Sequence, residues 1–321
     1  MPIDRRALLG SLAVAAAPLP PLDKAAPAPP VPSSETIPLW PNFPPGSPVA
    51  LPDTRLKRVP AGAHREYQLK GVAMPAIHVY RPAVANGIGL IVMPGGGYAY
   101  LSVENEGSRI ADWYTRHGYT VFVLNYRLPG EGWTNRADAP LQDAQRAIRI
   151  VRARAATWQV DPAKVGVIGF SAGGHAAASL ATMAGESLYE AIDAADRLPT
   201  RPAFVGLLYA VTTMQPFATH SVSRLNLLGP NPSAALVLRR SPVDHVGKDT
   251  PPCFLVHALD DGTVPADCSI DWMAACRKAG VPVEAHLIEH GGHGFGLHLP
   301  DTNPGSLWPE MFLRWTNRHI A

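Results

Sequence analysis

Short apolar runs alternate along the chain with longer segments of helical periodicity. The runs are rich in Val, Ile, Leu and Phe and predict strands at residues 76–80, 89–93, 121–126, 164–170, 203–208, 253–258 and 283–289. The periodic segments predict helices at residues 104–117, 138–158, 172–183, 266–279 and 309–318. Strands that alternate with helices in this way predict an α/β fold, with a mostly parallel central sheet and helices on both faces.

One predicted strand runs directly into the motif Gly169-x-Ser171-x-Gly173, and a helix rich in small residues follows at once. A strand, a tight turn and a helix in this order are typical of a nucleophile elbow, in which only glycine fits on either side of the serine. The turn would hold the Ser171 hydroxyl above the sheet edge. The sequence therefore predicts a serine hydrolase with Ser171 as its nucleophile.

Catalysis by a serine hydroxyl needs a base that removes its proton and an acid that orients the base. Downstream of Ser171, an acidic loop follows one predicted strand and a glycine-flanked histidine follows the next. Asp261 and His293 occupy these places, in the chain order serine, acid, histidine. The sequence therefore predicts a catalytic triad of Ser171, Asp261 and His293.

Each partner of the serine has a rival close by. Asp260 adjoins Asp261, and because successive side chains point to opposite sides, only one of them can reach the histidine. We expect Asp261 in this role, three residues before Val264, and we expect Asp260 to cap the turn through its own backbone. His290 is the rival of His293 and is otherwise interpreted as a polar strand end.

The strand predicted before the first long helix opens into three glycines, Gly95, Gly96 and Gly97. Backbone N–H groups in such a loop can approach a substrate oxygen and stabilise the negative charge that develops on it. We expect Gly96, Gly97 and the residue after the serine, Ala172, to donate these hydrogen bonds. A phosphate-binding loop is the other use of such glycines, but no Gly-Lys-Ser/Thr follows.

Several short segments indicate a protein family when they are taken together, although none of them does so alone. They are Met93-Pro-Gly-Gly-Gly-Tyr98, Asn125-Tyr-Arg-Leu128, Asp161-Pro162, Gly169-Phe-Ser-Ala-Gly-Gly-His175, Asp260-Asp261 and Gly292-His-Gly-Phe295. Together they resemble the esterase branch of the α/β-hydrolases that includes acetylxylan-esterase-like enzymes, from about Ile77 to the C-terminus. The resemblance implies an α/β-hydrolase fold and a carboxylesterase that removes acyl groups, above all acetyl, from carbohydrate such as xylan fragments. Lipase-type relatives carry a histidine where this chain has Pro94, which separates it from that subgroup.

Two other functions stay open at this point. A prolyl-type serine peptidase uses the same triad, although we find no propeller-sized extra domain in the 321 residues. A binding protein on a disabled hydrolase scaffold is the alternative without catalysis. The presence of all three triad residue types and of both oxyanion segments disfavours it.

Loops at the carboxyl ends of the strands form the pocket in this architecture. Residues 209–229 make up such a loop, of a length that suits a fairly open site for an acyl group on a sugar. We expect Tyr98, Met214, His220 and Arg224 to line this pocket.

Charged residues on the helices predicted at residues 104–117 and 138–158 can be interpreted without a role in ligand binding. Glu104 and Glu106 follow the glycine loop and could touch substrate, but we expect them to compensate the positive end of the helix that they begin. The arginines of the helix predicted from residue 138 have a spacing that suggests a solvated face rather than an anion site. They are Arg146, Arg149, Arg152 and Arg154.

Composition argues against several partners. A net charge of +2 and the lack of a basic cluster interleaved with aromatic residues give no footprint for nucleic acid. Histidines 286, 290, 293 and 298 lack a helical His-x-x-x-His pair with a carboxylate, so we expect neither a metal nor a cofactor. Cys253, Cys268 and Cys276 are odd in number, and the last two would lie about 12 Å apart along one helix. We therefore expect all three cysteines to be buried free thiols. The expected partner is a small-molecule or oligosaccharide ester, and the oligomeric state stays open.

The N-terminal part carries a different signal. Arg5 and Arg6 precede a short apolar stretch that ends at Ala17, as in a twin-arginine export signal, and the stretch is too short for a permanent membrane span. Proline is dense in the sequence that follows. We interpret residues 1–30 as a signal peptide with the start of a linker, residues 31–75 as an extended segment packing on the domain, and residues 76–321 as the catalytic domain. The predicted location is the bacterial periplasm or outside the cell, and an uncleaved leader tethered to the membrane is the alternative.

Overall fold

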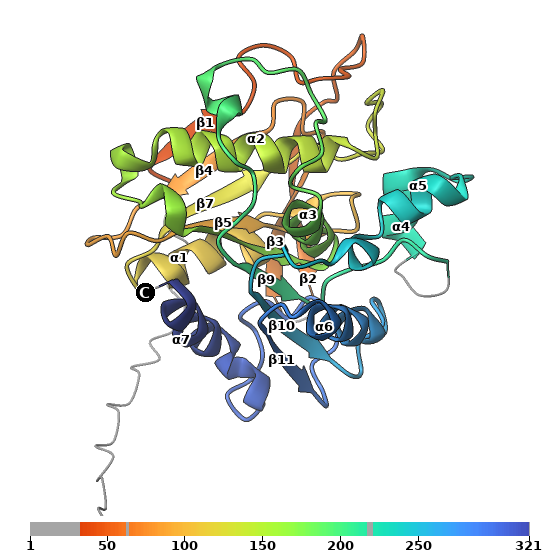
Figure 1. Cartoon of the computed structure of the whole chain (residues 1–321). Coiled ribbons are helices and arrows are strands. Elements are labelled where there is room, and N and C mark those ends of the chain that lie inside the picture. The colour runs from red at the N-terminus through yellow and green to blue at the C-terminus, as the bar shows by residue number, and fades with distance from the viewer. Residues whose placement is uncertain (1–32, 62–63, 217–220, 321) are drawn as a thin grey trace, which may run out of the picture.

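The computed structural model describes residues 33–61, 64–216 and 221–320. An eight-stranded sheet crosses the molecule in the order β1-β4-β7-β5-β8-β9-β10-β11 (Figure 1). The strands are β1 (Glu35–Pro38), β4 (Ala76–Tyr80), β5 (Gly89–Met93), β7 (Thr120–Asn125), β8 (Val165–Phe170), β9 (Val205–Leu208), β10 (Cys253–Ala258) and β11 (Val283–Ile288). In the part of the sheet that runs β7-β5-β8-β9-β10-β11, neighbouring strands pair in parallel. Strand β4 is antiparallel to both β1 and β7. This mostly parallel sheet confirms the predicted α/β fold.

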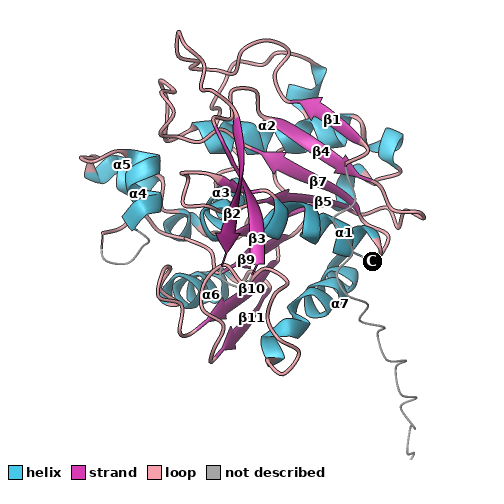
Figure 2. Cartoon of the chain, turned by 180° about the vertical axis from the view of Figure 1, so that it is seen from behind, coloured by secondary structure: helices cyan, strands magenta, loops and turns pink. Residues whose placement is uncertain are grey.

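Helices cover both faces of the sheet. The face toward the viewer in Figure 1 carries α2 (Ala139–Ala153), α3 (Ser171–Thr182) and α6 (Asp267–Ala279). The opposite face, seen in Figure 2, carries α1 (Arg109–Thr115) and α7 (Trp308–Ile320). Two short helices, α4 (Ser221–Leu228) and α5 (Ala234–Arg239), lie side by side at one end of the molecule in both views.

Alternating side chains of the central strands fill two cores. In β5, Ile91 belongs to the core under α2 and α3, while Leu90 and Val92 belong to the core under α1 and α7. On α7, Trp308 and Phe312 are spaced four residues apart, so they lie on one side of the helix and are fully buried against the sheet. Burial of each such side chain contributes about 2–3 kcal/mol. This packing fixes the strands whose carboxyl ends carry the candidate site.

A small second sheet lies beside the main one, with β2 (Arg55–Ala61), β3 (His64–Lys70) and β6 (Leu101–Ser102) in the order β2-β3-β6. The hairpin of β2 and β3 faces the viewer in Figure 2. Its last strand pairs antiparallel with β6, Gln68 opposite Ser102 and Leu69 opposite Leu101. Part of the segment interpreted only as extended, residues 31–75, thus forms strands that contact the residues just after the glycine loop.

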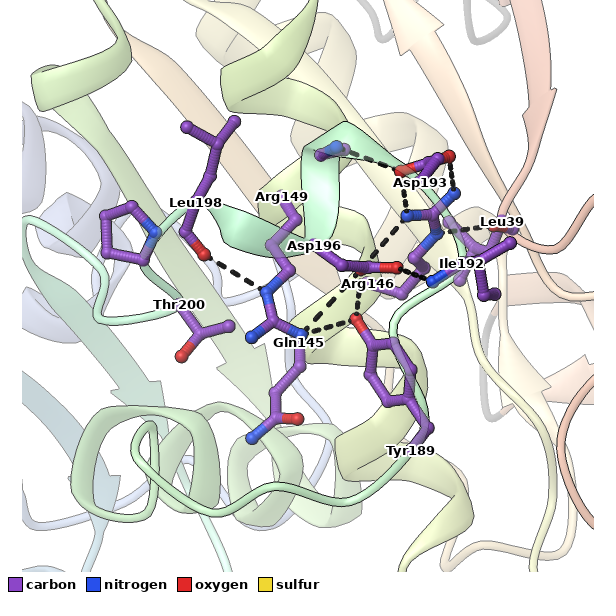
Figure 3. A network of polar contacts seen from close by, with 12 residues as sticks. Leu39, Gln145, Arg146, Arg149, Tyr189, Ile192, Asp193, Asp196, Leu198 and Thr200 are labelled. Atoms are coloured by element: carbon purple, nitrogen blue, oxygen red, sulfur yellow. Dashed lines mark hydrogen bonds and ion pairs between the residues drawn. The ribbon is translucent and has the colours of Figure 1, made fainter.

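Four arginines, three in α2 and Arg154 just after it, were predicted to lie on a solvated face, and this interpretation is wrong for Arg146. Arg146 is buried, and its guanidinium pairs with Asp193 at 2.6 Å and with Asp196 at 3.0 Å (Figure 3). The hydrogen bond to Asp193 raises the pKa of Arg146, against the opposing effect of burial. Arg149 donates to the Tyr189 hydroxyl at 2.6 Å in the same network (Figure 3). The network ties α2 to the loop after α3, because Asp193 lies 47 residues beyond Arg146.

Arg152 in the last turn of α2 and Arg154 just after the helix also have partners. Arg152 donates to the Pro162 carbonyl at 3.0 Å, and Arg154 pairs with Glu35 of β1 at 2.8 Å. Glu35 also accepts a hydrogen bond of 3.0 Å from the Trp158 indole. The Trp158 bond, followed by Arg154, lowers the pKa of Glu35 although burial acts in the other direction. These contacts fasten the edge strand β1 to the domain.

The three cysteines are free and buried, which confirms that prediction. The sulfurs of Cys253 and Cys276 lie 3.8 Å apart in the core under α6. Burial raises the pKa of both Cys253 and Cys268, so the thiols stay protonated.

Within the described ranges, none of the helices combines the length and the apolar character needed to cross a membrane. The predicted export signal at residues 1–30 lies outside the described residues.

Candidate active site

The turn between β8 and α3 holds Ser171 at a φ of +51°, in the left-handed region that residues other than glycine rarely adopt. A Cβ on Gly169 would lie 2.4 Å from the Gly173 carbonyl oxygen, and one on Gly173 would lie 2.1 Å from that of Met93. Only glycine therefore fits at these two positions, as the motif predicted. The strained turn brings Ser171 to the carboxyl edge of the parallel strands.

The three residues predicted as a triad lie in one hydrogen-bonded chain. His293 Nε2 is 2.9 Å from Ser171 Oγ, and His293 Nδ1 is 2.6 Å from Asp261 Oδ2. The Asp261 side chain is fully buried, and the His293 ring is 19% exposed. With its proton on Nδ1, the imidazole donates to Asp261 and leaves Nε2 able to accept the proton of Ser171.

The surroundings of Asp261 keep its carboxylate charged. Oδ1 accepts hydrogen bonds from the backbone N–H groups of Thr263 at 2.8 Å and Val264 at 2.9 Å. Burial alone would raise the pKa of Asp261, but hydrogen bonds from His257 and His293 outweigh it and hold the pKa well below its usual range. An acid that stays ionised in this position can stabilise the imidazolium that forms when the histidine takes the serine proton.

The alternative residues lie elsewhere. Asp260 Oδ1 accepts hydrogen bonds of 2.8 Å from the N–H groups of both Gly291 and Gly292, and its Oδ2 is 3.2 Å from His290 Nδ1. The expectation that Asp260 caps its own turn is wrong, because Asp261 does so through Oδ1. Asp260 instead fastens the loop that precedes His293, while His290 is 74% exposed and pairs with Asp260 rather than with the serine.

His257, in β10, is a part of the site that the sequence analysis missed. It is fully buried, with Nε2 at 3.3 Å from Asp261 Oδ2 and at 3.1 Å from the Val264 carbonyl oxygen, and Nδ1 at 2.8 Å from Ser269 Oγ. Because Nε2 faces two acceptors, it carries the proton, and the Ser269 hydroxyl donates to Nδ1. The spacing of four residues from Asp261 was the available signal, but a histidine within an apolar strand fits a core position equally well.

The glycine loop offers backbone donors beside Ser171. The N–H of Gly95 donates to Glu106 Oε2 at 2.7 Å, whereas the N–H groups of Gly96 and Gly97 have no hydrogen-bond partner among the described residues. Gly96 has a φ of +125°, and a Cβ there would lie 2.2 Å from the Tyr100 carbonyl oxygen. Ala172 lies in the first turn of α3, where backbone N–H groups lack acceptors within the helix. The three predicted oxyanion donors therefore border the serine.

Side chains from distant elements hold this loop. The Tyr126 hydroxyl donates to the Pro94 carbonyl at 2.5 Å, and Asn226 Nδ2 donates to that of Gly97 at 2.8 Å. Glu106, expected to compensate a helix end, is buried instead and accepts hydrogen bonds from the Gly95 N–H and, at 2.9 Å, from the Tyr209 hydroxyl. Burial raises the pKa of Glu106, although the Gly95 N–H acts in the opposite direction.

A cavity of about 500 Å³ opens in front of Ser171. It is lined by Glu66, Gly96, Gly97, Ala99, Tyr100, Ser102, Asn105, Glu106, Ser171, Val222, Thr263, His293 and Gly294. The residues come from the small sheet, the glycine loop, α4 and the loops of Asp261 and His293. The cavity therefore gives a ligand access to Ser171.

Three of the predicted pocket residues, Tyr98, Met214 and Arg224, are not among those that line this cavity. Tyr98 is 1% exposed and its hydroxyl is 2.8 Å from His175 Nδ1, and Met214 is fully buried, so their assignment to the pocket is wrong. Arg224 donates to the Met214 carbonyl at 2.9 Å. His220 lies outside the described residues.

A serine on a strained turn, a histidine and a buried aspartate at the carboxyl edge of a mostly parallel sheet define an α/β-hydrolase. The model of the BD-FAE family matches residues 77–275, more than half of the chain, and the chain belongs to this family. The match, with the relatives and the solved structure described next, confirms the predicted fold and the predicted likeness to acetylxylan esterases.

Curated relatives and solved structures agree with this assignment. The chain is 35% identical to an acetylxylan esterase of Xylanibacter ruminicola over 68% of this chain and 43% of the relative. It is 33% identical to endo-1,4-beta-xylanase B of Butyrivibrio fibrisolvens over 64% of this chain and 32% of the relative. The chain thus spans less than half the length of these two relatives. Among solved structures, it is similar to an acetyl ester-xyloside bifunctional hydrolase from Caldicellulosiruptor lactoaceticus, with a TM-score of 0.73, 34% identity, and coverage of 90% of this chain and 97% of that one.

Proposed function

We propose that the chain is a serine carboxylesterase that removes acyl groups, above all acetyl, from carbohydrate esters such as acetylated xylan fragments. The observation that carries this proposal is the hydrogen-bonded chain from Ser171 through His293 to Asp261, which ends at a cavity open to a ligand.

In the proposed mechanism, Ser171 Oγ attacks the ester carbonyl while His293 Nε2 takes the hydroxyl proton. Asp261 keeps the imidazole in the required tautomer and stabilises the imidazolium. The carbonyl oxygen, now negatively charged, accepts hydrogen bonds from the N–H groups of Gly96, Gly97 and Ala172, each worth about 3 kcal/mol of transition-state stabilisation.

Collapse of the tetrahedral intermediate breaks the bond to the alcohol, and His293 returns the proton to the departing alkoxide oxygen. The acyl group then remains on Ser171. Water attacks this acyl-enzyme with His293 as the base again, so that the carboxylic acid leaves and Ser171 recovers its proton. Each step of this mechanism uses only groups of the chain, the ester and water.

Support for an acetyl ester of a sugar comes from two directions. Two of the three related proteins named above are an acetylxylan esterase and an acetyl ester-xyloside bifunctional hydrolase. The lining of the cavity also includes polar side chains, among them Glu66, Tyr100, Ser102 and Asn105. Such groups can form hydrogen bonds with an alcohol that carries hydroxyls.

We also propose that the protein is exported through a twin-arginine signal. Arg5 and Arg6, followed by a short apolar stretch, support this assignment. An acetyl esterase of plant-type polysaccharide would meet its substrate outside the cytoplasm. Replacement of both arginines by lysine should leave the protein in the cytoplasmic fraction, and unchanged export would contradict the assignment.

A parallel set of incubations tests the activity. The substrates are acetylated xylo-oligosaccharides, p-nitrophenyl acetate, longer p-nitrophenyl esters and a prolyl peptide amide, each with wild type and with Ser171→Ala. Acetate release from the sugar that depends on Ser171 supports the proposal. Cleavage of the peptide alone would favour a peptidase, and no turnover of any substrate would favour a binding protein.

A further inference from the structure

One wall of the cavity in front of Ser171 comes from the small sheet rather than from the main one. Glu66 of β3 and Ser102 of β6 both line this cavity. The Ser102 hydroxyl donates to Glu66 Oε2 at 2.7 Å, and Gln68 Nε2 donates to Glu66 Oε1 at 3.0 Å. Strand pairing places Gln68 opposite Ser102, so the register of the sheet holds the carboxylate in position.

Glu66 retains room for further hydrogen bonds. Each carboxylate oxygen has two lone pairs, and each accepts only one hydrogen bond from the described residues. The residue is only 8% exposed, so these free acceptor sites have little access to bulk water except through the cavity. A hydroxyl group of a ligand in the cavity would supply the missing donor, and a hydrogen bond to a charged acceptor is stronger than one between neutral groups.

The wall is also negative. Glu106 lines the same cavity, and none of the described lining residues is a lysine or an arginine. Burial, with the charges of Glu66 and Glu106, raises the pKa of Tyr100 to about 12. The Tyr100 phenol therefore remains protonated at neutral pH and can donate a hydrogen bond to a ligand oxygen. An anionic group in this cavity would meet the Glu66 carboxylate and no lysine or arginine of the described lining.

We propose that Glu66, oriented by Ser102, determines specificity by binding a hydroxyl group of the alcohol part of the ester, and that it excludes alcohols that carry a carboxylate. The preferred substrates are acyl esters of neutral sugars, and esters of uronic acids are rejected. The inference rests on the proposed esterase function and deepens it. It assigns a role in substrate binding to the N-terminal hairpin, which lies outside the segment matched to the family model.

The test compares wild type with Glu66→Gln on three acetyl esters. An acetylated methyl xyloside carries neutral hydroxyls, an acetylated glucuronic acid carries a carboxylate, and p-nitrophenyl acetate carries neither. We expect Glu66→Gln to lower kcat/KM for the xyloside roughly 10-fold or more, as for loss of a charged hydrogen bond. The same variant should raise kcat/KM for the glucuronic acid ester and should change kcat/KM for p-nitrophenyl acetate much less than kcat/KM for the xyloside.

Glu190→Gln is the matched control, because Glu190 is exposed and does not line the cavity. It should change none of the three values. Ser102→Ala provides a second variant that keeps the charge of Glu66. It should lower kcat/KM for the xyloside selectively while the glucuronic acid ester stays rejected.

The results separate this inference from the proposed function. If wild type releases no acetate from any ester in a manner that depends on Ser171, the esterase function itself fails. If wild type is active but both variants change all three substrates equally, or change none, Glu66 does not determine specificity. A wild-type enzyme that cleaves the glucuronic acid ester as well as the xyloside would also overturn the inference.

Discussion

Replacement of Asp261 by asparagine tests which of the two adjacent aspartates orients the histidine. The carboxylate has donors on both sides, the N–H groups of Thr263 and Val264 on Oδ1 and the rings of His293 and His257 on Oδ2. An asparagine amide has only one oxygen. Whichever way it is turned, its NH₂ group faces donors.

The two orientations of the amide differ in cost. With the NH₂ toward the loop, two buried N–H groups lose their acceptor, at about 1–3 kcal/mol each. With the NH₂ toward His293, the imidazole must accept at Nδ1 and carry its proton on Nε2, which then points at Ser171 and no longer acts as a base. We expect the second orientation, with the same outcome as the corresponding change in serine proteases, where kcat falls about 10⁴-fold, or roughly 5 kcal/mol.

Asp260→Asn is the matched control. Its amide oxygen can keep the hydrogen bonds from Gly291 and Gly292, and the ion pair between Asp260 and His290 lies exposed to solvent, where its removal costs little. Its kcat should stay within about threefold of wild type. Initial rates with p-nitrophenyl acetate, alongside thermal melts that verify folding, measure both variants. A folded Asp261→Asn enzyme with more than about a tenth of the wild-type kcat would refute the reasoning, as would an equal loss in Asp260→Asn.

Three further predictions follow from the same geometry. Gly173→Ala should destabilise the fold by about 3 kcal/mol because its Cβ would lie 2.1 Å from the Met93 carbonyl oxygen. Gly185→Ala is the control, since a Cβ there has nothing within 4 Å, and it should melt like wild type. Equal melting temperatures of the two variants would contradict the steric argument. His257→Leu should lower kcat roughly 10-fold with KM unchanged, since the substitution removes a hydrogen bond to the Asp261 carboxylate. An unaltered kcat would show that His257 does not help to position Asp261. The depressed folded pKa of Asp261 stabilises the protein above the unfolded pKa of about 3.9 and ceases to do so as the pH falls through the folded value. Urea unfolding should therefore show the largest difference between wild type and Asp261→Asn near pH 7 and a smaller one below about pH 4, and a difference that grows on acidification would contradict this sign.

The central sheet could be predicted from the sequence because its signals are local. Strands β4, β5 and β10 have the predicted bounds. β5 and β10 are buried along their whole length, as is typical of parallel strands covered on both faces, and β4 is buried at Ala76, Ile77 and Val79. The elbow was equally accessible, because the glycines beside Ser171 are required by contacts within a few residues or with the neighbouring strand.

Features that depend on pairing across the sequence escaped prediction. The β2–β3 hairpin is mostly charged or polar, and its place beside the site depends on pairing of Gln68 with Ser102, far along the chain. The partners of Arg146 are similarly distant, so its helical spacing alone suggested a solvated face. Long-range ion pairs override such a local pattern.

The direction of individual side chains was the other limit. Tyr98 adjoins the glycine loop and was assigned to the pocket, but its φ of +59° turns the ring into the core against His175. Tyr100, two residues further on, lines the cavity instead. Distance along the chain from a loop does not specify which side chains face a ligand when the backbone adopts left-handed conformations.

Labelling with a fluorophosphonate probe tests the central claim, that Ser171 is a nucleophile activated by His293. Peptide mass spectrometry of labelled wild type should locate the adduct on Ser171, and Ser171→Ala should remain unlabelled while His293→Ala reacts far more slowly. Persistent labelling of a folded Ser171→Ala protein, or an adduct on another residue of wild type, would contradict the account.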